Sequence, residues 1–152
     1  MTQADQDSIL SVFKSATADG VIVYRAYSGI MSIALAMALK NAGREDVIVY
    51  AVESEKSNCE LIEKASILNF VSNIKVIRNN IGNQTENSSN YSSWNEFVKS
   101  KKLMSLYYSP DTLYLKNQIG NVSVIYVNEN HELFLDGCKE IIKSCNPVVI
   151  KG

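Results

Sequence analysis

The residues best suited to chemistry lie in a turn that contains Ser and Gly, and at an acid that ends a β-branched run. Residues 21–24 read Val-Ile-Val-Tyr, and residues 25–29 read Arg-Ala-Tyr-Ser-Gly. Backbone N–H groups at a helix start after such a turn can approach a ligand, and an acid at the next strand tip can accept hydrogen bonds from ribose hydroxyls. Glu53 holds that second position. The spacing therefore predicts a nucleotide-type ligand site at residues 25–29 and Glu53.

The elements that position this site follow from hydrophobic periodicity. An apolar Ala/Leu/Met-rich run at residues 30–39 separates two β-branched runs, which is the order of a βαβ unit. The same reading predicts strands at 21–24, 47–53, 74–77, 122–127 and 147–150, and helices at 7–17, 29–41, 54–68 (with Ser54 as N-cap), 94–102 and 132–144, with a short helix starting at 111. The right-handed crossover rule makes such strands parallel. We therefore expect an α/β three-layer sandwich with a mostly parallel, Rossmann-like sheet of about five strands.

Composition sets further limits. The chain has 152 residues, of which 46% are hydrophobic and 20% charged, and we expect one domain over residues 1–152, with a flexible Asn/Ser-rich loop at 79–93. A net charge of -1 offers no general attraction to nucleic acid or to a membrane surface, so neither is an expected partner. The polar start of the chain lacks a signal-peptide pattern, and run 30–39 is too short to span a bilayer, so we predict a cytoplasmic protein.

The cysteines do not suggest a metal centre. Cys59, Cys138 and Cys145 lack metal-type spacing, so no metal site is predicted. Cys138 and Cys145 fall seven residues apart on one predicted helix. We expect them to be small buried apolar side chains.

The C-terminal third carries a family resemblance. Residues 122–137 read Val-Ser-Val-Ile-Tyr-Val-Asn-Glu-Asn-His-Glu-Leu-Phe-Leu-Asp-Gly, and a Pro-led β-branched run follows at 147–150. This pattern resembles the FkbM-type methyltransferases, and the likeness extends upstream to the strand at 49–53 and the helix residues 61–69. The resemblance implies a class I methyltransferase fold, here without the usual C-terminal hairpin, and O-methyl transfer from S-adenosylmethionine.

The resemblance also implies which residues meet the cofactor. The family's first loop, approximately Asp-x-Gly-Ala-Asn-x-Gly, aligns with residues 23–29, where Val23, Arg25 and Tyr27 replace Asp, the first Gly and Asn. The implied cofactor contacts are the loop, the ribose-binding acid and the tip of the fourth strand: Ala26, Tyr27, Ser28, Gly29, Glu53 and Asn128. For Glu53 the other reading is an exposed acid at a helix entry. Arg25 either blocks the cofactor pocket or binds a different, anionic ligand.

His131 and Glu129, which follow the fourth strand, are the candidates for catalysis. His131 is the sole histidine and could act as a general base on an acceptor hydroxyl, or be a surface residue at a helix start. Glu129 and Glu132 could orient an acceptor or a metal, or be acids favoured by the helix dipole.

An aromatic acceptor pocket could form from four tyrosines, which could instead pack in the core and at its rim: Tyr107, Tyr108, Tyr114 and Tyr126.

Two functions follow from these residues. The first is S-adenosylmethionine-dependent O-methyl transfer to the hydroxyl of a small molecule or glycan. The second is a methyltransferase-like domain without turnover that serves as a binding or assembly subunit, with a protein partner or a second copy of itself. The replaced loop residues favour the second for activity, while the predicted fold is the same under both.

Overall fold

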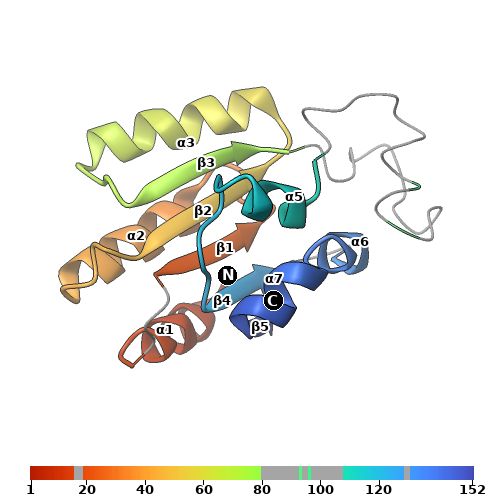
Figure 1. Cartoon of the computed structure of the whole chain (residues 1–152). Helices are drawn as coiled ribbons and strands as arrows, with labels where there is room; N and C mark the ends of the chain where they lie inside the picture. The colour runs from red at the N-terminus through yellow and green to blue at the C-terminus, as the bar shows by residue number, and fades with distance from the viewer. Residues whose placement is uncertain (16–18, 80–92, 94–95, 97–107, 129–130) are drawn as a thin grey trace.

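The computed structural model describes residues 1–15, 19–79, 93, 96, 108–128 and 131–152. Its centre is one sheet in which every neighbouring pair of strands is parallel. The strand order is β3-β2-β1-β4-β5 (Figure 1). The strands are β1 (Gly20–Tyr24), β2 (Ile48–Glu53), β3 (Ile74–Arg78), β4 (Val124–Val127) and β5 (Val148–Lys151).

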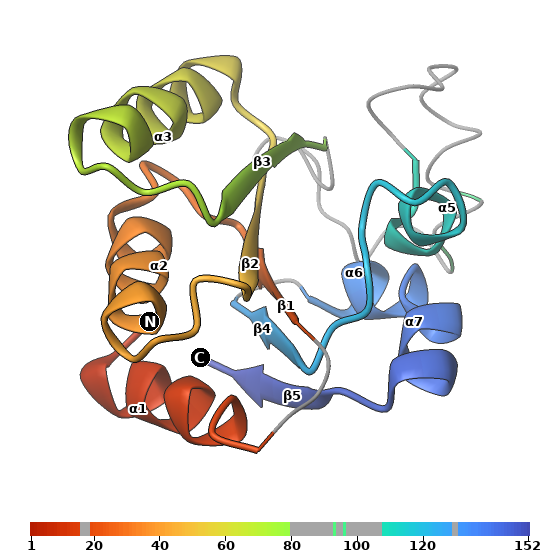
Figure 2. The ribbon, with the colours of Figure 1, turned by 60° about the vertical axis from the view of Figure 1, so that its left-hand side comes forward.

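Helices cover both faces of the sheet. One face carries α1 (Gln3–Val12), α2 (Ile30–Asn41) and α3 (Lys56–Leu68), and the other carries α5 (Pro110–Leu115), α6 (Glu132–Asp136) and α7 (Lys139–Cys145) (Figure 2). The predicted α/β Rossmann-like sandwich with a five-stranded sheet is thereby confirmed.

The alternation of side chains along the strands explains the two cores. Val21 and Val23 of β1 point toward α1 and α2, whereas Ile22 and Tyr24 point toward the opposite helices. All five residues of β1 are buried, as expected for a central parallel strand that is covered on both faces. The sheet can therefore hold its strand ends at fixed positions, and those ends carry the candidate site.

Two helix starts differ from the sequence-based prediction. The first helix begins at Gln3 rather than at residue 7, because Thr2 and Asp5 form a capping box, and it ends at Val12. The predicted N-cap of the third helix, Ser54, is also wrong. Glu55 is the N-cap, and its N–H donates to the Glu53 carboxylate at 2.9 Å.

The helix expected over residues 132–144 is in fact two helices. Gly137 ends α6, and its carbonyl accepts a hydrogen bond from the Asp111 N–H at 2.9 Å. A Cβ on Gly137 would lie 3.0 Å from Pro110 Cδ, so the start of α5 packs directly against the break. The prediction that Cys138 and Cys145 share one helix is therefore wrong, because Cys138 is the N-cap of α7.

Asp111 supplies the cap that Cys138 cannot. Its two carboxylate oxygens accept the N–H groups of Glu140 and Ile141, each at 2.9 Å. We expect Asp111→Ala to lower the free energy of unfolding by about 2–3 kcal/mol, because two charge-assisted bonds to a helix start are lost. Urea unfolding would measure this. The stability of Asp111→Asn should fall between those of wild type and Asp111→Ala, since the amide oxygen can accept only one of the two N–H groups. Asp7→Ala, on the exposed side of α1, should change stability little. Equal stability of Asp111→Ala and wild type would contradict the capping role.

Several predicted features fall outside the described residues. They are most of the loop at 79–93, nearly all of the helix at 94–102, Tyr107, and the candidate residue Glu129. Asn79, at the start of that loop, is described and is buried. Within the described part of the chain, no helix combines the length and apolar character needed to cross a membrane.

Candidate functional site

The carboxyl ends of β1 and β4 define the candidate site. The chain leaves β1 through α2 toward β2 on one side, while β4 lies on the other side of β1 and leads to α6 on the opposite face. Open α/β sheets bind ligands at the point where the strand order reverses in this way. The turn at residues 25–29 lies there, as the sequence predicts.

The backbone of this turn has an unusual conformation. Arg25 and Tyr27 have φ values of 59° and 51°, and Gly29 has 82°. Left-handed backbone suits glycine and costs about 1 kcal/mol or more for other residues. The loop is held by two hydrogen bonds of 2.9 Å, from Ala26 N–H to the Val52 carbonyl and from Gly29 N–H to the Ala26 carbonyl. The turn thus keeps a glycine-type conformation at positions where two of the three residues are not glycine.

Glu53 ties this turn to the next helix. One carboxylate oxygen accepts the Tyr27 N–H at 2.9 Å, and the other accepts the Glu55 N–H at 2.9 Å and the Asn58 side-chain amide at 3.2 Å. The residue is only 4% exposed, so the alternative reading as an exposed acid is wrong. The predicted ribose acid therefore lies at the correct strand tip, and three of the roughly four lone-pair positions of its carboxylate are already used.

Arg25 lies across the ring of its neighbour. Its Nε donates to Tyr24 Oη at 3.2 Å, and its guanidinium carbon lies 5.6 Å from the Tyr24 ring centroid. The Tyr24 ring stacks on Phe134 of α6, with centroids 4.3 Å apart and planes at 11°. A buried aromatic pair thus fixes where the half-buried guanidinium lies.

A pocket of about 320 Å³ opens beside this turn. The predicted contacts Ala26, Tyr27 and Asn128 line it, as does Arg25, whereas Ser28, Gly29 and Glu53 do not. Val23 and Tyr126, which the sequence analysis names in the first loop and among the tyrosines, also line it, whereas four lining residues were missed: Met1, Met31, Ser32 and Gly152. Ser32 had a signal, because it is the one polar residue in the apolar run 30–39. Met1 and Gly152 had none, since only the fold brings the two ends of this chain together (Figure 2).

His131 lies at the start of α6 and does not line the pocket. Its Nδ1 is 2.9 Å from the Asn128 carbonyl oxygen, and its Nε2 is 3.9 Å from Glu132 Oε1. A carbonyl can only accept, so Nδ1 carries the hydrogen in this arrangement, and Nε2 of a neutral ring holds the lone pair. This tautomer makes Nε2 the nitrogen that can accept a proton. Glu132 lies beside it, which fits the helix-dipole reading as well.

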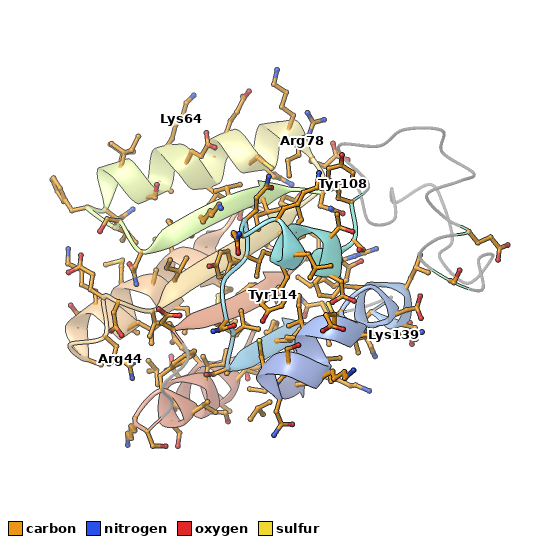
Figure 3. The ribbon with its side chains drawn as sticks, in the orientation of Figure 1. Arg44, Lys64, Arg78, Tyr108, Tyr114 and Lys139 are labelled. Atoms are coloured by element: carbon orange, nitrogen blue, oxygen red, sulfur yellow. The ribbon has the colours of Figure 1, made fainter. Side chains whose placement is uncertain are left out.

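The tyrosines that were candidates for one shared pocket are dispersed. Tyr126 lines the pocket, but Tyr114 on α5 donates to Asn121 Oδ1 at 3.0 Å, and the ring of Tyr108 faces Lys116 (Figure 3). No single aromatic acceptor pocket forms from the three that the structure describes. Tyr108 and Tyr114 act in packing around α5, which was the alternative prediction.

The three thiols differ in burial, which predicts their reactivity. All are free; Cys59 and Cys138 are buried, and Cys145 is partly exposed. Burial, with the nearby Glu53 charge, raises the pKa of Cys59 to about 11, and burial raises that of Cys138. We expect a disulfide reagent at pH 8 to modify Cys145 rapidly and the other two only on unfolding. Rapid labelling of Cys59 in folded protein would contradict this expectation, and Cys145→Ser is the control in which the fast phase should disappear.

The raised pKa of Cys59 also makes stability depend on pH. Because the folded state keeps a Cys59 proton that the unfolded state loses, the free energy of unfolding should fall as pH rises from 9 toward 11.

Comparisons with known proteins support the fold. Precorrin-6y C5,15-methyltransferase from Geobacter metallireducens GS-15 matches with a TM-score of 0.53 and 9% identity over 94% of this chain. Precorrin 8W decarboxylase from Methanobacterium thermoautotrophicum matches with a TM-score of 0.51 and 14% identity over 95% of it. The match spans 57% of each of those two proteins. No family model and no curated protein sequence matches the chain.

The sheet order, the layers and these neighbours define the class. The domain has the class I, Rossmann-like methyltransferase fold. At 9% and 14% identity, such likeness establishes the fold alone, because one fold hosts many functions. Any activity must be argued from the residues at the carboxyl edge.

Proposed function

We propose that this domain binds S-adenosylmethionine at the carboxyl edge of β1, β2 and β4, and takes part in O-methyl transfer to the hydroxyl of a small molecule or glycan, as in FkbM-type enzymes. One observation carries the proposal: the left-handed backbone at residues 25, 27 and 29 beside a pocket at the switch point. Strained backbone that the surrounding structure maintains is typical of ligand sites.

The donor would be held by three parts of this edge. The turn at residues 26–29 would border the donor beside Glu53, whose carboxylate accepts the Tyr27 N–H. Glu53 retains acceptor capacity for a ribose hydroxyl, and Asn128 presents an amide at the tip of β4. When bound, the donor supplies a methyl group on a positively charged sulfur. The residues of the chain have to orient that group and exclude water from it.

The acceptor side would use His131. In methyl transfer the acceptor oxygen forms a bond to the methyl carbon as the methyl–sulfur bond breaks, the sulfur keeps the electron pair, and the hydroxyl loses its proton. His131 Nε2 is the ring nitrogen available to take this proton, because Nδ1 faces the Asn128 carbonyl. Glu129 would belong to the same acceptor side through the family resemblance.

A second candidate is binding without turnover, and a specific observation favours it. Arg25 lines the pocket at the position where the family has its first glycine, and Glu53 is engaged by three hydrogen bonds within the chain. A domain of this kind would act through a protein partner or a second copy of itself.

The test is calorimetric titration with S-adenosylmethionine and S-adenosylhomocysteine, run beside an assay of labelled methyl transfer to hydroxyl compounds. We expect binding of both ligands, weakened in Asn128→Ala but not in Asn69→Ala, because Asn69 lies at the far end of α3. Binding with transfer supports the first candidate, and binding without transfer supports the second. No heat and no thermal shift at millimolar ligand would contradict S-adenosylmethionine binding.

A further inference from the structure

One side chain in the lining of the pocket beside β1 is charged, that of Arg25. The chain ends Met1 and Gly152 also line the pocket, and no ion pair joins the Gly152 carboxylate to Arg25. Across the described residues, no carboxylate forms an ion pair with Arg25. Its guanidinium is half-buried, and the groups that hydrogen-bond it are the phenols of Tyr24 and Tyr27. A partly buried cation without a counter-charge is costly, and an anion would relieve that cost.

The guanidinium is also held in one orientation. The Nε–Tyr24 hydrogen bond and the stacked Tyr24–Phe134 pair fix the plane of the group. The two terminal nitrogens of an arginine form a fork that matches the two oxygens of a carboxylate or phosphate. Fixing the fork before binding reduces the entropy lost when an anion is captured.

An independent observation comes from Ser32. Ser32 lines the same pocket from the first turn of α2, and its hydroxyl is fully buried without a hydrogen-bond partner. Buried hydroxyls in native proteins are almost always paired, so an orphan here indicates a partner that is not part of the chain. The N-terminus of this 12-residue helix favours a negative charge at the same place.

We propose that the methyl acceptor carries an oxyanion, a carboxylate or a phosphate, which binds between Arg25 and the first turn of α2. Arg25 then determines specificity for the acceptor and touches its anionic group rather than its reacting hydroxyl. The donor's ribose acid, Glu53, does not line this pocket, whose walls come from β1, β4, α2 and the two ends of this chain. The acceptor assignment rests on the proposed function, whereas the oxyanion site itself does not.

The experiment titrates the purified chain with inorganic phosphate and separately with acetate, with and without saturating S-adenosylhomocysteine. We expect phosphate or acetate to bind, and Arg25→Gln to weaken that binding by about tenfold or more, as loss of a charged hydrogen-bonding partner does. The anion affinity of Arg25→Lys should lie between those of wild type and Arg25→Gln, because lysine keeps the positive charge but lacks the two terminal nitrogens of the guanidinium. Arg78→Gln is the matched control, since Arg78 ends β3 at the same edge of the sheet, two strands away (Figure 3).

The outcomes separate this inference from the proposed function. Anion binding that depends on Arg25 and persists with S-adenosylhomocysteine present supports the acceptor assignment. Displacement of the anion by S-adenosylhomocysteine would overturn that assignment, because Arg25 would then hold the donor's own carboxylate. Anion binding through Arg25 without any nucleoside binding would keep the oxyanion site and refute the methyltransferase function. Equal anion affinity in Arg25→Gln and wild type would overturn the site, and the phosphate and acetate arms decide which oxyanion it takes.

Ser32→Ala provides a further readout that a purely structural serine would not give. Removing a buried hydroxyl without a partner from the first turn of α2 should raise stability by a small but measurable shift in melting temperature. The same change should weaken anion binding severalfold, because one donor is lost. A variant that is more stable and yet binds less well would mark Ser32 as a ligand contact. Unchanged anion affinity in Ser32→Ala would remove it from the site.

Discussion

Gly29→Ala is expected to lower the free energy of unfolding by about 2–4 kcal/mol, with two causes of similar size. Gly29 has a φ of 82°, which disfavours any side chain. A Cβ there would also lie 2.3 Å from Cγ1 of Ile62, a fully buried residue of α3, so either Ile62 or the backbone must shift. The glycine therefore lets α2 pack against α3 directly behind the ligand turn. Urea unfolding monitored by circular dichroism would measure the change.

Gly43→Ala is the matched control. Gly43 has a similar φ of 77°, but no atom lies within 4 Å of the position its Cβ would take. It should lose only the backbone part, about 1 kcal/mol. In the double variant Gly29→Ala, Ile62→Ala the loss should be smaller than the sum of the two single losses, because Cγ1 of Ile62, the atom that the new Cβ would meet, is removed. Equal losses at Gly29 and Gly43 would show that the contact with Ile62 contributes nothing.

The fold was predictable because its signals are local. The β-branched runs at 21–24 and 122–127 are continuously apolar, as expected of strands that are buried on both faces of a sheet. Successive side chains of such a strand point to opposite faces. Helix 30–39 reads as apolar nearly all round because it packs between the sheet, α1 and α3. These signals need no knowledge of distant residues. The sheet and its helices therefore follow from the sequence.

The wrong starts of α1 and α3 are local errors, since the residues that set them lie within three positions of each other. The other errors arise where a distant residue decides the local structure. The break between α6 and α7 depends on Asp111, which is 29 and 30 residues away from the N–H groups it accepts. The Glu53 carboxylate is occupied by the N–H of Tyr27, 26 residues earlier. The pocket is lined by both Met1 and Gly152, which are 151 positions apart in the sequence. Local periodicity carries no information on such pairs, so the sequence names only part of the residues that line the pocket at this edge.

Arg25 illustrates a limit of a different kind. The sequence leaves two alternatives, a side chain that blocks the cofactor pocket or one that binds an anion. The structure shows a guanidinium held over Tyr24 at the pocket wall, with no carboxylate partner among the described residues. Neither propensity nor periodicity describes where a long side chain lies. Placing this one required the stacked Tyr24–Phe134 pair, whose rings come from opposite ends of the sequence.

Glu53→Gln is expected to destabilise the domain by about 3 kcal/mol, the second large effect. The carboxylate accepts two backbone N–H groups, from Tyr27 and Glu55, and an amide oxygen can satisfy only one of them. The new NH₂ group would then face another donor in a site that is 4% exposed. Chemical unfolding at neutral pH measures the loss. Glu60→Gln on the outer face of α3, whose ion pair with Lys56 is long at 3.9 Å and solvent-exposed, should change stability by less than about 0.5 kcal/mol.

The structural role of Glu53 changes how any ligand titration of this residue must be interpreted. If Glu53 only braces the turn, Glu53→Gln should weaken S-adenosylmethionine and the anion at Arg25 together, because both depend on the turn at residues 25–29. If Glu53 also contacts the ribose, the nucleoside should lose more affinity than the anion does. Measuring both ligands on one variant, well below its melting temperature, therefore separates a ribose contact from a loosened loop. Undiminished stability in Glu53→Gln would instead show that its three hydrogen bonds contribute little, and would leave the carboxylate free for a ligand.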